Sequence, residues 1–269
     1  MKNKDVAIMY DFDGTLAHGN IQEYNFIPKL KMTSDEFFRE VNELKVNNNM
    51  EGILAYMYLM LKKAEEKNVS VTRSSFVKYG ENIKLFPGVD DWFDRINSYA
   101  ESLGLKLHHF VISSGIKEMI EGTSISNKFD RIYASSFLYN VDNIAKWPAV
   151  AINYTNKTQF LFRINKGVYE VYDDKINEHM SREEKSIDFP NMIYIGDGFT
   201  DVPCMRLVKD YLGTSIAVYE KNDGKSVADK LLKHNRVNFI AKTDYTEGSD
   251  IDIYIKEKLD EIALRSNQC

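Results

Sequence analysis

The sequence predicts an α/β fold in which a mostly parallel sheet forms the core and a helical segment is inserted into it. Short apolar runs alternate along the chain with segments of helical periodicity, as they do in proteins with parallel sheets. Several apolar runs end in small residues and aspartates, which is typical of strands whose carboxyl ends carry ligand-binding loops. Residues 20–84 show helical periodicity alone and separate the first run from the others.

Length and composition agree with this class. The chain has 269 residues, of which 43% are hydrophobic and 28% charged, and this excludes collagen-like and disordered proteins. The 35 basic and 40 acidic side chains leave a net charge of −5, and the basic residues are scattered among acids. We therefore expect no nucleic acid as a partner. Cys204 and Cys269 allow at most one disulfide, and we expect both to be free thiols in a reducing compartment.

We expect no segment of the chain to enter a membrane. The apolar run 6–10 is ended by Asp11 and Asp13, so it is too short for a secretory signal. The longest apolar stretch, residues 52–61, has about half of the roughly 20 residues that span a bilayer. The sequence therefore predicts a cytoplasmic protein without a membrane partner.

The first strand is predicted over residues 6–10, a continuous apolar run that ends at Asp11. Three later segments carry apolar residues at the spacing of a helix face. They lie at 37–44, 50–61 and 92–103. The run at 33–36 has the form of a helix start, and Gly104 that of a helix end.

The rest of the chain alternates between strands and helices. Strands are predicted where short apolar runs occur, at 105–112, 192–195, 216–219 and 237–241. Helices are predicted at 116–120, 157–165, between the last two strands, and at 253–264. Residues 131–153 are rich in β-branched and aromatic side chains around the turn 140–143 and predict a hairpin. The polar stretch 172–188 predicts a surface excursion.

Two aspartates leave the first predicted strand together, in the run Asp11-Phe12-Asp13-Gly14-Thr15. Two acids at a strand end are costly unless a cation or a partner lies beside them. One ionised carboxylate can attack an electrophile while the other transfers protons. A solvated turn is the alternative for this run taken by itself. A calcium loop of the EF-hand kind is excluded, because its sixth position must be glycine and is Leu16 here.

A second acidic run, Gly196-Asp197-Gly198-Phe199-Thr200-Asp201, follows the strand predicted at 192–195. Its glycines allow the backbone to approach a ligand, and its carboxylates suit Mg²⁺, which binds one or two carboxylates together with phosphate oxygens. A plain turn is the alternative. A dinucleotide-binding loop is excluded, because Asp201 stands where its last glycine would be.

A phosphate group would also find partners after the strand predicted at 105–112. Ser113 offers a hydroxyl at the entrance of a short predicted helix, beside Ser114 and Gly115. A simple helix cap is an equal alternative for Ser113.

Lys157 is the second candidate for phosphate binding. It lies in the first turn of a helix that we expect Asn156 to cap, in a capping box with Gln159. A cation at that end opposes the helix dipole, whereas Lys166 at the other end is favoured by it. The local structure gains nothing from Lys157, so we assign phosphate binding to it rather than to Lys166.

These runs, in this order, resemble the four motifs of the haloacid-dehalogenase superfamily of phosphatases. The resemblance spans residues 10–201, and the helical stretch between the first two motifs is similar to the cap of the phosphoserine-phosphatase-like branch. It implies a Rossmann-like catalytic core formed by residues 1–15 and 85–269, with residues 16–84 as a helical cap. It also implies an enzyme that uses Mg²⁺ to hydrolyse a small phosphorylated metabolite.

The resemblance implies roles for single residues as well. Asp11 would be the nucleophile that forms an aspartyl-phosphate, and Asp13 would be the general acid and base. The phosphate would be held by Ser113, Ser114, Gly115 and Lys157. Mg²⁺ would be bound by Asp11, the carbonyl of Asp13 and Asp197, with Asp201 supporting these ligands.

Asp13 favours a phosphatase over a dehalogenase, because an alcohol leaves with a proton and a halide does not. Phosphoryl transfer to a second hydroxyl, as in a mutase, and a non-catalytic module that binds phosphate esters are the alternatives. The phosphoserine branch usually has an acid nine positions after the nucleophile, where this chain has Asn20, so the substrate is left open. No oligomeric state follows from the sequence.

Overall fold

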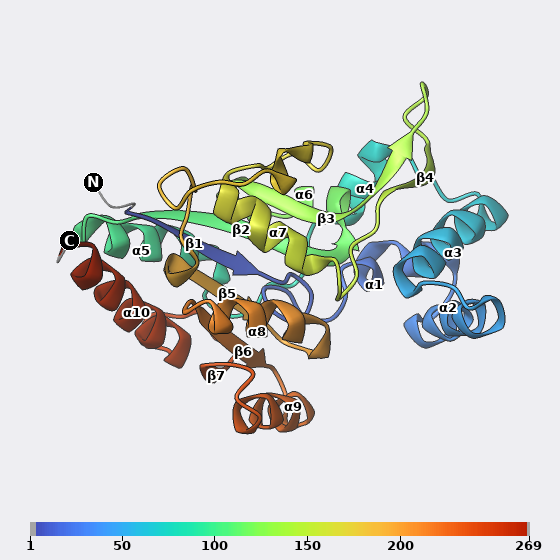
Figure 1. The fold of residues 1–269 in the computed structure, drawn as a ribbon. Coiled ribbons are helices and arrows are strands. Elements are labelled where there is room, and N and C mark those ends of the chain that lie inside the picture. Colours follow the sequence, from blue (N-terminus) through green and yellow to red (C-terminus); the bar gives the residue numbers. More distant parts are fainter. Residues whose placement is uncertain (1–3, 268–269) are drawn as a thin grey trace.

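In the computed structural model, which describes residues 4–267, the chain forms a seven-stranded sheet in the order β4-β3-β2-β1-β5-β6-β7 (Figure 1). The strands are β1 (Asp5–Tyr10), β2 (Lys106–Ile116), β3 (Arg131–Tyr139), β4 (Ala145–Val150), β5 (Met192–Gly196), β6 (Thr214–Tyr219) and β7 (Phe239–Lys242). Neighbouring strands are parallel except β3 and β4, which form an antiparallel hairpin. The predicted α/β class, its mostly parallel sheet and the hairpin are confirmed.

Helices connect the strands and cover both faces of the sheet. They are α1 (Gln22–Asn25), α2 (Ser34–Asn48), α3 (Gly52–Lys67), α4 (Arg73–Tyr79), α5 (Val89–Ser102), α6 (Lys117–Glu121), α7 (Lys157–Lys166), α8 (Val202–Asp210), α9 (Asn222–Lys233) and α10 (Asp250–Asn267). Helix α8 is not predicted from the sequence. It carries a proline in its first turn, where the missing N–H costs nothing. Among the described residues, no helix is long and apolar enough to cross a membrane.

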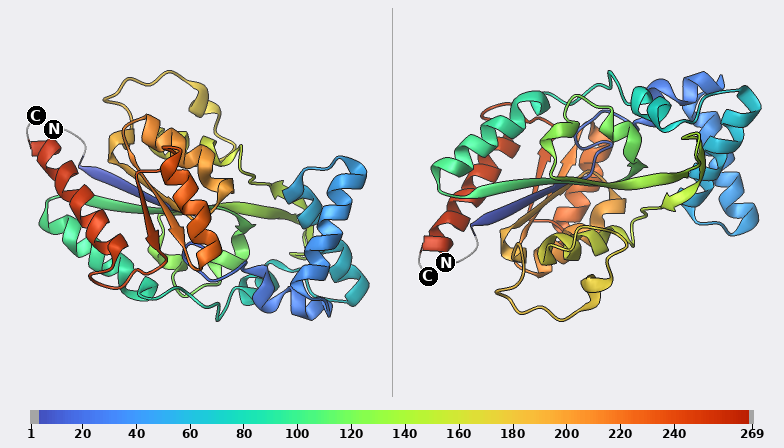
Figure 2. Two further views of the ribbon diagram at one scale, coloured as in Figure 1. Left: turned by 90° about the horizontal axis from the view of Figure 1, so that it is seen from below. Right: turned by 90° about the horizontal axis from the view of Figure 1, so that it is seen from above.

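Side chains on the two faces of β1 pack into two separate core clusters, one on each side of the sheet. Val6, Ile8 and Tyr10 belong to one core cluster, with the buried residues of α5, α6 and α10. Ala7 and Met9 belong to the other, with buried residues of α7, α8 and α9. Figure 2 shows α5 and α10 side by side on one side of the sheet. Because both faces are covered, the strand is apolar throughout rather than alternating.

The order in which strands are added to the sheet switches sides at β1. From β1 it continues to β2 on one side, and it later returns to β5 on the other side. In open parallel sheets, ligands bind beyond the carboxyl ends of the strands where this switch occurs. We therefore expect a ligand site at the residues that follow Tyr10.

Residues between β1 and α5 form the helices α1, α2, α3 and α4, which extend beyond the β3–β4 hairpin (Figures 1 and 2). The helix start predicted at 33–36 is a capping box in which Thr33 and Glu36 each accept a backbone N–H of the other residue. Helix α3 contacts β4, and the segment before α4 joins the hairpin where the Ala145 amide donates to the Val71 carbonyl. The inserted helices therefore pack on the hairpin as well as on each other.

Two glycines allow α4 to approach α6 closely. A Cβ on Gly80 would collide with the carbonyl oxygen of Met119, and one on Gly122 with the carbonyl of Val77. An ion pair between Arg73 and Glu121 links the same two helices. The backbones of α4 and α6 are therefore in direct contact, and this contact holds the inserted segment against the layer of the sheet that carries α6.

The local structure predicted for residues 113–115 is wrong. Strand β2 continues through Ser113 and Gly115 to Ile116, so the turn predicted there is absent from the described chain, and Ser113 is not a helix cap. The strand extends because Ile116 still pairs with Ser135 of β3 after a shift of register.

Of the two cysteines, Cys204 is a buried free thiol, whereas Cys269 lies outside the described residues.

Candidate active site

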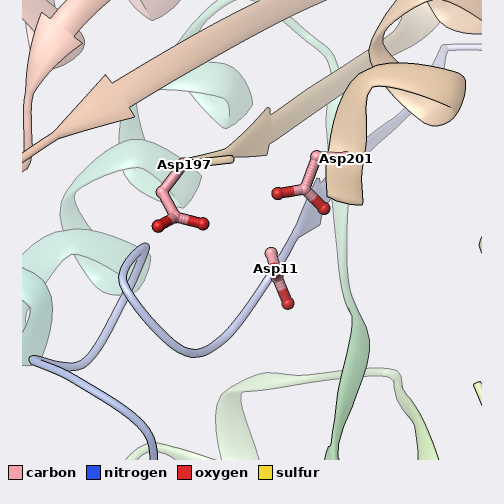
Figure 3. A group of neighbouring side chains, drawn as sticks. All are labelled: Asp11, Asp197 and Asp201. Carbon is pink, nitrogen blue, oxygen red and sulfur yellow. The ribbon is translucent and has the colours of Figure 1, made fainter. Parts of the chain in front are cut away.

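Three aspartates meet beyond the carboxyl end of β1 (Figure 3). Asp11, Asp197 and Asp201 each offer a carboxylate oxygen, and these oxygens lie within 4.8 Å of one another. Asp11 is 6% exposed and Asp201 is fully buried, whereas Asp197 is half-buried. The two acidic runs that the sequence placed at strand ends thus form one cluster.

Neighbouring parallel strands bring these aspartates together. Asp11 follows β1, and its amide donates to the Ile195 carbonyl of β5, 2.9 Å away. Asp197 follows β5 directly, and Asp201 ends the short 3-10 helix η5 (Phe199–Asp201) that leads into α8. Gly14 adopts φ 71°, a conformation that favours glycine, and a Cβ there would displace the Asp197 carboxyl.

Lys157 lies between two of the aspartates. Its Nζ is 3.0 Å from Asp11 Oδ2 and donates to Asp201 Oδ1 at 2.8 Å. The residue is 1% exposed. Lys166, the alternative lysine, instead donates to the carbonyls of Ile176 and Glu178. Of the two, only Lys157 contacts the aspartate cluster.

The capping box predicted for α7 is wrong, although the helix begins at Lys157 as expected. Asn156 makes no side-chain bond to the first turn. Its Oδ1 accepts the Asn153 amide, and its Nδ2 donates to the Ala151 carbonyl. The asparagine therefore closes the loop before the helix, and sequence alone does not distinguish these two uses of its amide.

The acids raise one another's pKa values. Burial and the charge of Asp201 raise the pKa of Asp11 to about 6, although Lys157 opposes this. Burial, followed by the charges of Asp11 and Asp201, raises the pKa of Asp197 to about 8. Burial lowers the pKa of Lys157, but Asp11 and Asp201 raise it above its ordinary value, so the amine is charged. One ammonium group does not balance three carboxylates, and the cluster favours an added cation.

Asp13 faces a different set of groups. Its Oδ1 accepts the Ile21 amide at 2.9 Å. A Cβ on Gly115 would lie 3.3 Å from Asp13 Oδ2 and 3.4 Å from Ser113 Oγ, so the second predicted motif adjoins Asp13. Burial and the charge of Asp11 raise the pKa of Asp13 to about 8, and a protonated carboxyl there can donate a proton.

Ser113 is buried, and its Oγ accepts the Gly115 amide at 3.1 Å. Ser114 is half-buried in the same segment. The hydroxyl of Ser113 thus stabilises the backbone of this segment while its own proton is free to turn toward a ligand oxygen.

Tyr194 belongs to the site, although its position in the sequence does not predict this. It lies on β5, fully buried, and its hydroxyl donates to Asp201 Oδ1 at 2.8 Å. Asp201 Oδ2 accepts the Gly198 amide at 3.4 Å. The signal available in the sequence was a single hydroxyl in an otherwise apolar strand, and nothing in it showed which face the ring occupies.

The donor set fits a hard divalent cation. Carboxylate oxygens are the ligands that Mg²⁺ prefers, and it commonly uses one or two of them. Asp11 and Asp197 can supply these, whereas both oxygens of Asp201 already accept hydrogen bonds from Lys157, Tyr194 and Gly198. Asp201 therefore suits a supporting role next to the ligands.

Fold and site together define a class: α/β proteins with an acidic cluster, able to hold a cation, where the strand order of a parallel sheet switches sides. Comparison with known families gives the particular one. The profile of the haloacid dehalogenase-like hydrolases matches residues 8–206, and the chain belongs to this family.

Individual proteins resemble the chain along most of its length. An uncharacterized protein of Borreliella burgdorferi is 30% identical over 281 residues, covering 94% of this chain and 96% of its own. A HAD family hydrolase of Salmonella enterica serovar Typhi has a similar structure, with a TM-score of 0.60 at 13% identity, over 94% of this chain and 70% of that one. A phosphoserine phosphatase, solved as a phospho-aspartyl intermediate analogue, gives a TM-score of 0.57 at 13% identity, over 95% and 99%. At these identities the structural likeness establishes the fold.

Proposed function

We propose that this protein is a Mg²⁺-dependent phosphatase that hydrolyses a small phosphomonoester through an aspartyl-phosphate on Asp11. The observation that carries the proposal is the pairing of Asp11 with the buried ammonium group of Lys157, 3.0 Å away, inside an acidic cluster. A carboxylate can attack a phosphate dianion only where positive charge neutralises the incoming group. A site that merely bound phosphate would need no carboxylate there.

In the first step, an Asp11 oxygen attacks phosphorus and the bond from phosphorus to the alcohol oxygen breaks. The leaving oxygen takes a proton from Asp13, whose raised pKa keeps this proton available near neutral pH. In the second step, Asp13 accepts a proton from water as that water attacks the phosphorus of the aspartyl-phosphate. The bond from phosphorus to the Asp11 oxygen breaks, phosphate leaves, and both aspartates return to their starting state.

The remaining residues hold the phosphate group and its charge. Lys157 pairs with the phosphate oxygens during transfer, with Ser113, Ser114 and Gly115 on the side nearest to Asp13. Mg²⁺, when bound by Asp11, Asp197 and the carbonyl of Asp13, supplies further positive charge to the transferred group. Asp201 keeps Lys157 and the loop after β5 in position.

The proposal extends to the domain arrangement. Residues 1–15 and 85–269 would form the catalytic core, and residues 16–84 a helical cap that closes over the site and excludes water before attack. The names of the similar solved structures support a phosphatase, since one is a phosphoserine phosphatase with a phospho-aspartyl analogue.

Phosphate release from a panel of small esters tests the proposal. Phosphorylated amino alcohols, polyols, sugars and nucleotides are incubated with Mg²⁺ or with a chelator. We expect release with Mg²⁺ alone, and a loss of at least about 1,000-fold in Asp11→Asn, because that variant lacks the nucleophile. Asp210→Asn, at an exposed position on α8, is the matched control and should keep full activity. Turnover by Asp11→Asn at the wild-type rate would refute the assignment.

The same assay separates hydrolysis from transfer. When the reaction runs in ¹⁸O-labelled water, hydrolysis places one labelled oxygen in each released phosphate. A mutase would instead move the phosphoryl group to a second hydroxyl without incorporating label.

A further inference from the structure

Two short linkers, residues 15–18 and 84–87, join the inserted helices to the rest of the chain, and they pair with each other. Ala17 and Leu85 form an antiparallel bridge between them. Backbone hydrogen bonds on both sides of this bridge, each 3.0 Å long, join the linkers further. The chain therefore leaves β1 and returns toward α5 through one narrow two-stranded ribbon.

Tyr245 holds both linkers where this ribbon begins. Its hydroxyl donates to the Thr15 carbonyl at 3.0 Å, and its amide donates to the Pro87 carbonyl at 2.8 Å. Tyr245 and Thr15 are fully buried. A Cβ on Gly88 would lie 2.5 Å from the carbonyl carbon of Tyr245, so the second linker also meets this segment at backbone level. A single residue, 230 positions after Thr15, thus connects the roots of both linkers.

The layer formed by α5 and α10 fixes Tyr245 in turn. The Arg95 side chain of α5 donates to the carbonyl oxygen of Tyr245, and the tyrosine ring packs edge-on against Trp92 at a centroid distance of 5.5 Å. Arg95 also pairs with the buried Asp252 of α10, 3.3 Å away. The tyrosine is therefore held by helices that pack on the sheet, and not by the inserted helices.

Thr15 ends the loop that carries the proposed nucleophile and the proposed acid, residues 11–15, which we call the aspartate loop. The Phe12 carbonyl closes this loop into a turn by accepting the amides of residues 15–17 at 2.9–3.3 Å. A buried carbonyl that loses its donor costs free energy. The Tyr245 hydroxyl therefore stabilises the position of the end of the aspartate loop.

Motion of the inserted helices would reach the aspartates through this loop. In the proposed reaction these helices close over the site and open again, and the ribbon is their covalent connection to the sheet. The attacking oxygen has to keep its place during this motion, because a displacement of about 1 Å can cost roughly 100-fold in rate. A fixed point between the ribbon and the aspartate loop would meet this requirement.

We propose that Tyr245 is a positioning residue for the reaction. By anchoring Thr15 and Pro87 to the layer of α5 and α10, it lets the inserted helices move while the aspartate loop stays in place. The inference rests on the proposed phosphatase function. Tyr245 lies beyond the stretch of the chain that the family profile matches, so the profile does not predict this role.

Steady-state kinetics of Tyr245→Phe test the role on an ester that the wild type hydrolyses. We expect kcat to fall at least about 10-fold and KM to change less than about 2-fold, because a displaced nucleophile weakens the transition state and leaves substrate binding unchanged. Tyr99→Phe is the matched control. It removes a hydroxyl that joins α5 to α10 by donating to Asp260 at 2.9 Å, and it should keep both constants of the wild type.

Hydrogen exchange tests the anchor without enzymatic activity. In the wild type, the amide of Tyr245 should exchange no faster than the amides of Leu16 and Ala17, because an anchor that opens first cannot hold the loop. In Tyr245→Phe, the amides of Leu16 and Ala17 should exchange at least about 10-fold faster than in the wild type. In Tyr99→Phe they should keep the wild-type rate.

The results distinguish this inference from the proposed function. If the wild type hydrolyses no ester, the proposed function fails and the positioning role fails with it. If the wild type is active, a folded Tyr245→Phe variant with the wild-type kcat would overturn the positioning role and leave the phosphatase proposal intact. A wild-type Tyr245 amide that exchanges faster than those of Leu16 and Ala17 would do the same, and this comparison decides the matter even where the variant does not fold.

Discussion

At the scale of single residues, the site depends on one oxygen atom, Asp201 Oδ1. It accepts hydrogen bonds from the Lys157 ammonium group and from the Tyr194 hydroxyl, both at 2.8 Å. All three residues are at most 1% exposed. The aspartate therefore holds the lysine that faces Asp11, and the tyrosine restricts where the aspartate can turn.

Removing the tyrosine hydroxyl should weaken this arrangement. Tyr194→Phe deletes a buried bond to a charged acceptor, and we expect the free energy of unfolding to fall by about 2 kcal/mol in urea titrations. Tyr211→Phe, at a position that is 53% exposed, should change it by less than about 0.5 kcal/mol. Equal stability of the Tyr194→Phe variant and the wild type would mean that the hydroxyl is not needed to hold Asp201.

At the scale of elements, His108 joins three segments of the sheet. Its Nε2 is 2.9 Å from Asp5 of β1, and its Nδ1 is 2.8 Å from Asp130, just before β3. The hydrogen bond to Asp130 raises the pKa of His108 above its ordinary value of about 6.5, with a smaller contribution from Asp5, although burial opposes this. The protonated form of His108 thus links β1 to β2 and to the residue just before β3.

This raised pKa predicts a pH dependence of stability. The stabilisation is complete below about pH 6.5 and is lost as the pH rises through the raised pKa of the folded state. The melting temperatures of wild type and His108→Gln should therefore differ more at pH 5.5 than at pH 9, by the equivalent of about 1 kcal/mol. His234→Gln, at an exposed position after α9, is the control. A difference that grows toward pH 9 would contradict the prediction.

The elements also differ in how far the sequence predicts them. Strand β1 and the aspartates after it follow from an apolar run and its end, both local signals, and parallel strands bring such ends together. The extension of β2 past Ser113 depends on pairing with Ser135 of β3, and local residues carry no sign of it. The close approach of α4 to α6 at Gly80 and Gly122 likewise depends on how the inserted helices pack on the core.

At the scale of the whole molecule, the proposed function requires the inserted helices to lie against the catalytic core. The contact of α4 with α6 is made at backbone level, because Gly80 faces the Met119 carbonyl and Gly122 faces that of Val77. A methyl group at either glycine meets backbone, which cannot turn aside as a flexible side chain would. The whole segment must shift to accommodate it.

Gly80→Ala should therefore displace α4 from α6. We expect overpacking to lower the free energy of unfolding by about 1–3 kcal/mol. We also expect kcat/KM for a hydrolysed ester to fall, because the inserted helices would no longer close over the proposed site. Gly52→Ala is the matched control in the same segment, because its added methyl would make ordinary contacts with the flexible Lys45 side chain. Urea titration and ester hydrolysis of both variants measure the two effects. If Gly80→Ala lost stability but kept full kcat/KM, the seating of α4 on α6 would serve folding alone, and closure over the site would have to come from another contact of the inserted helices.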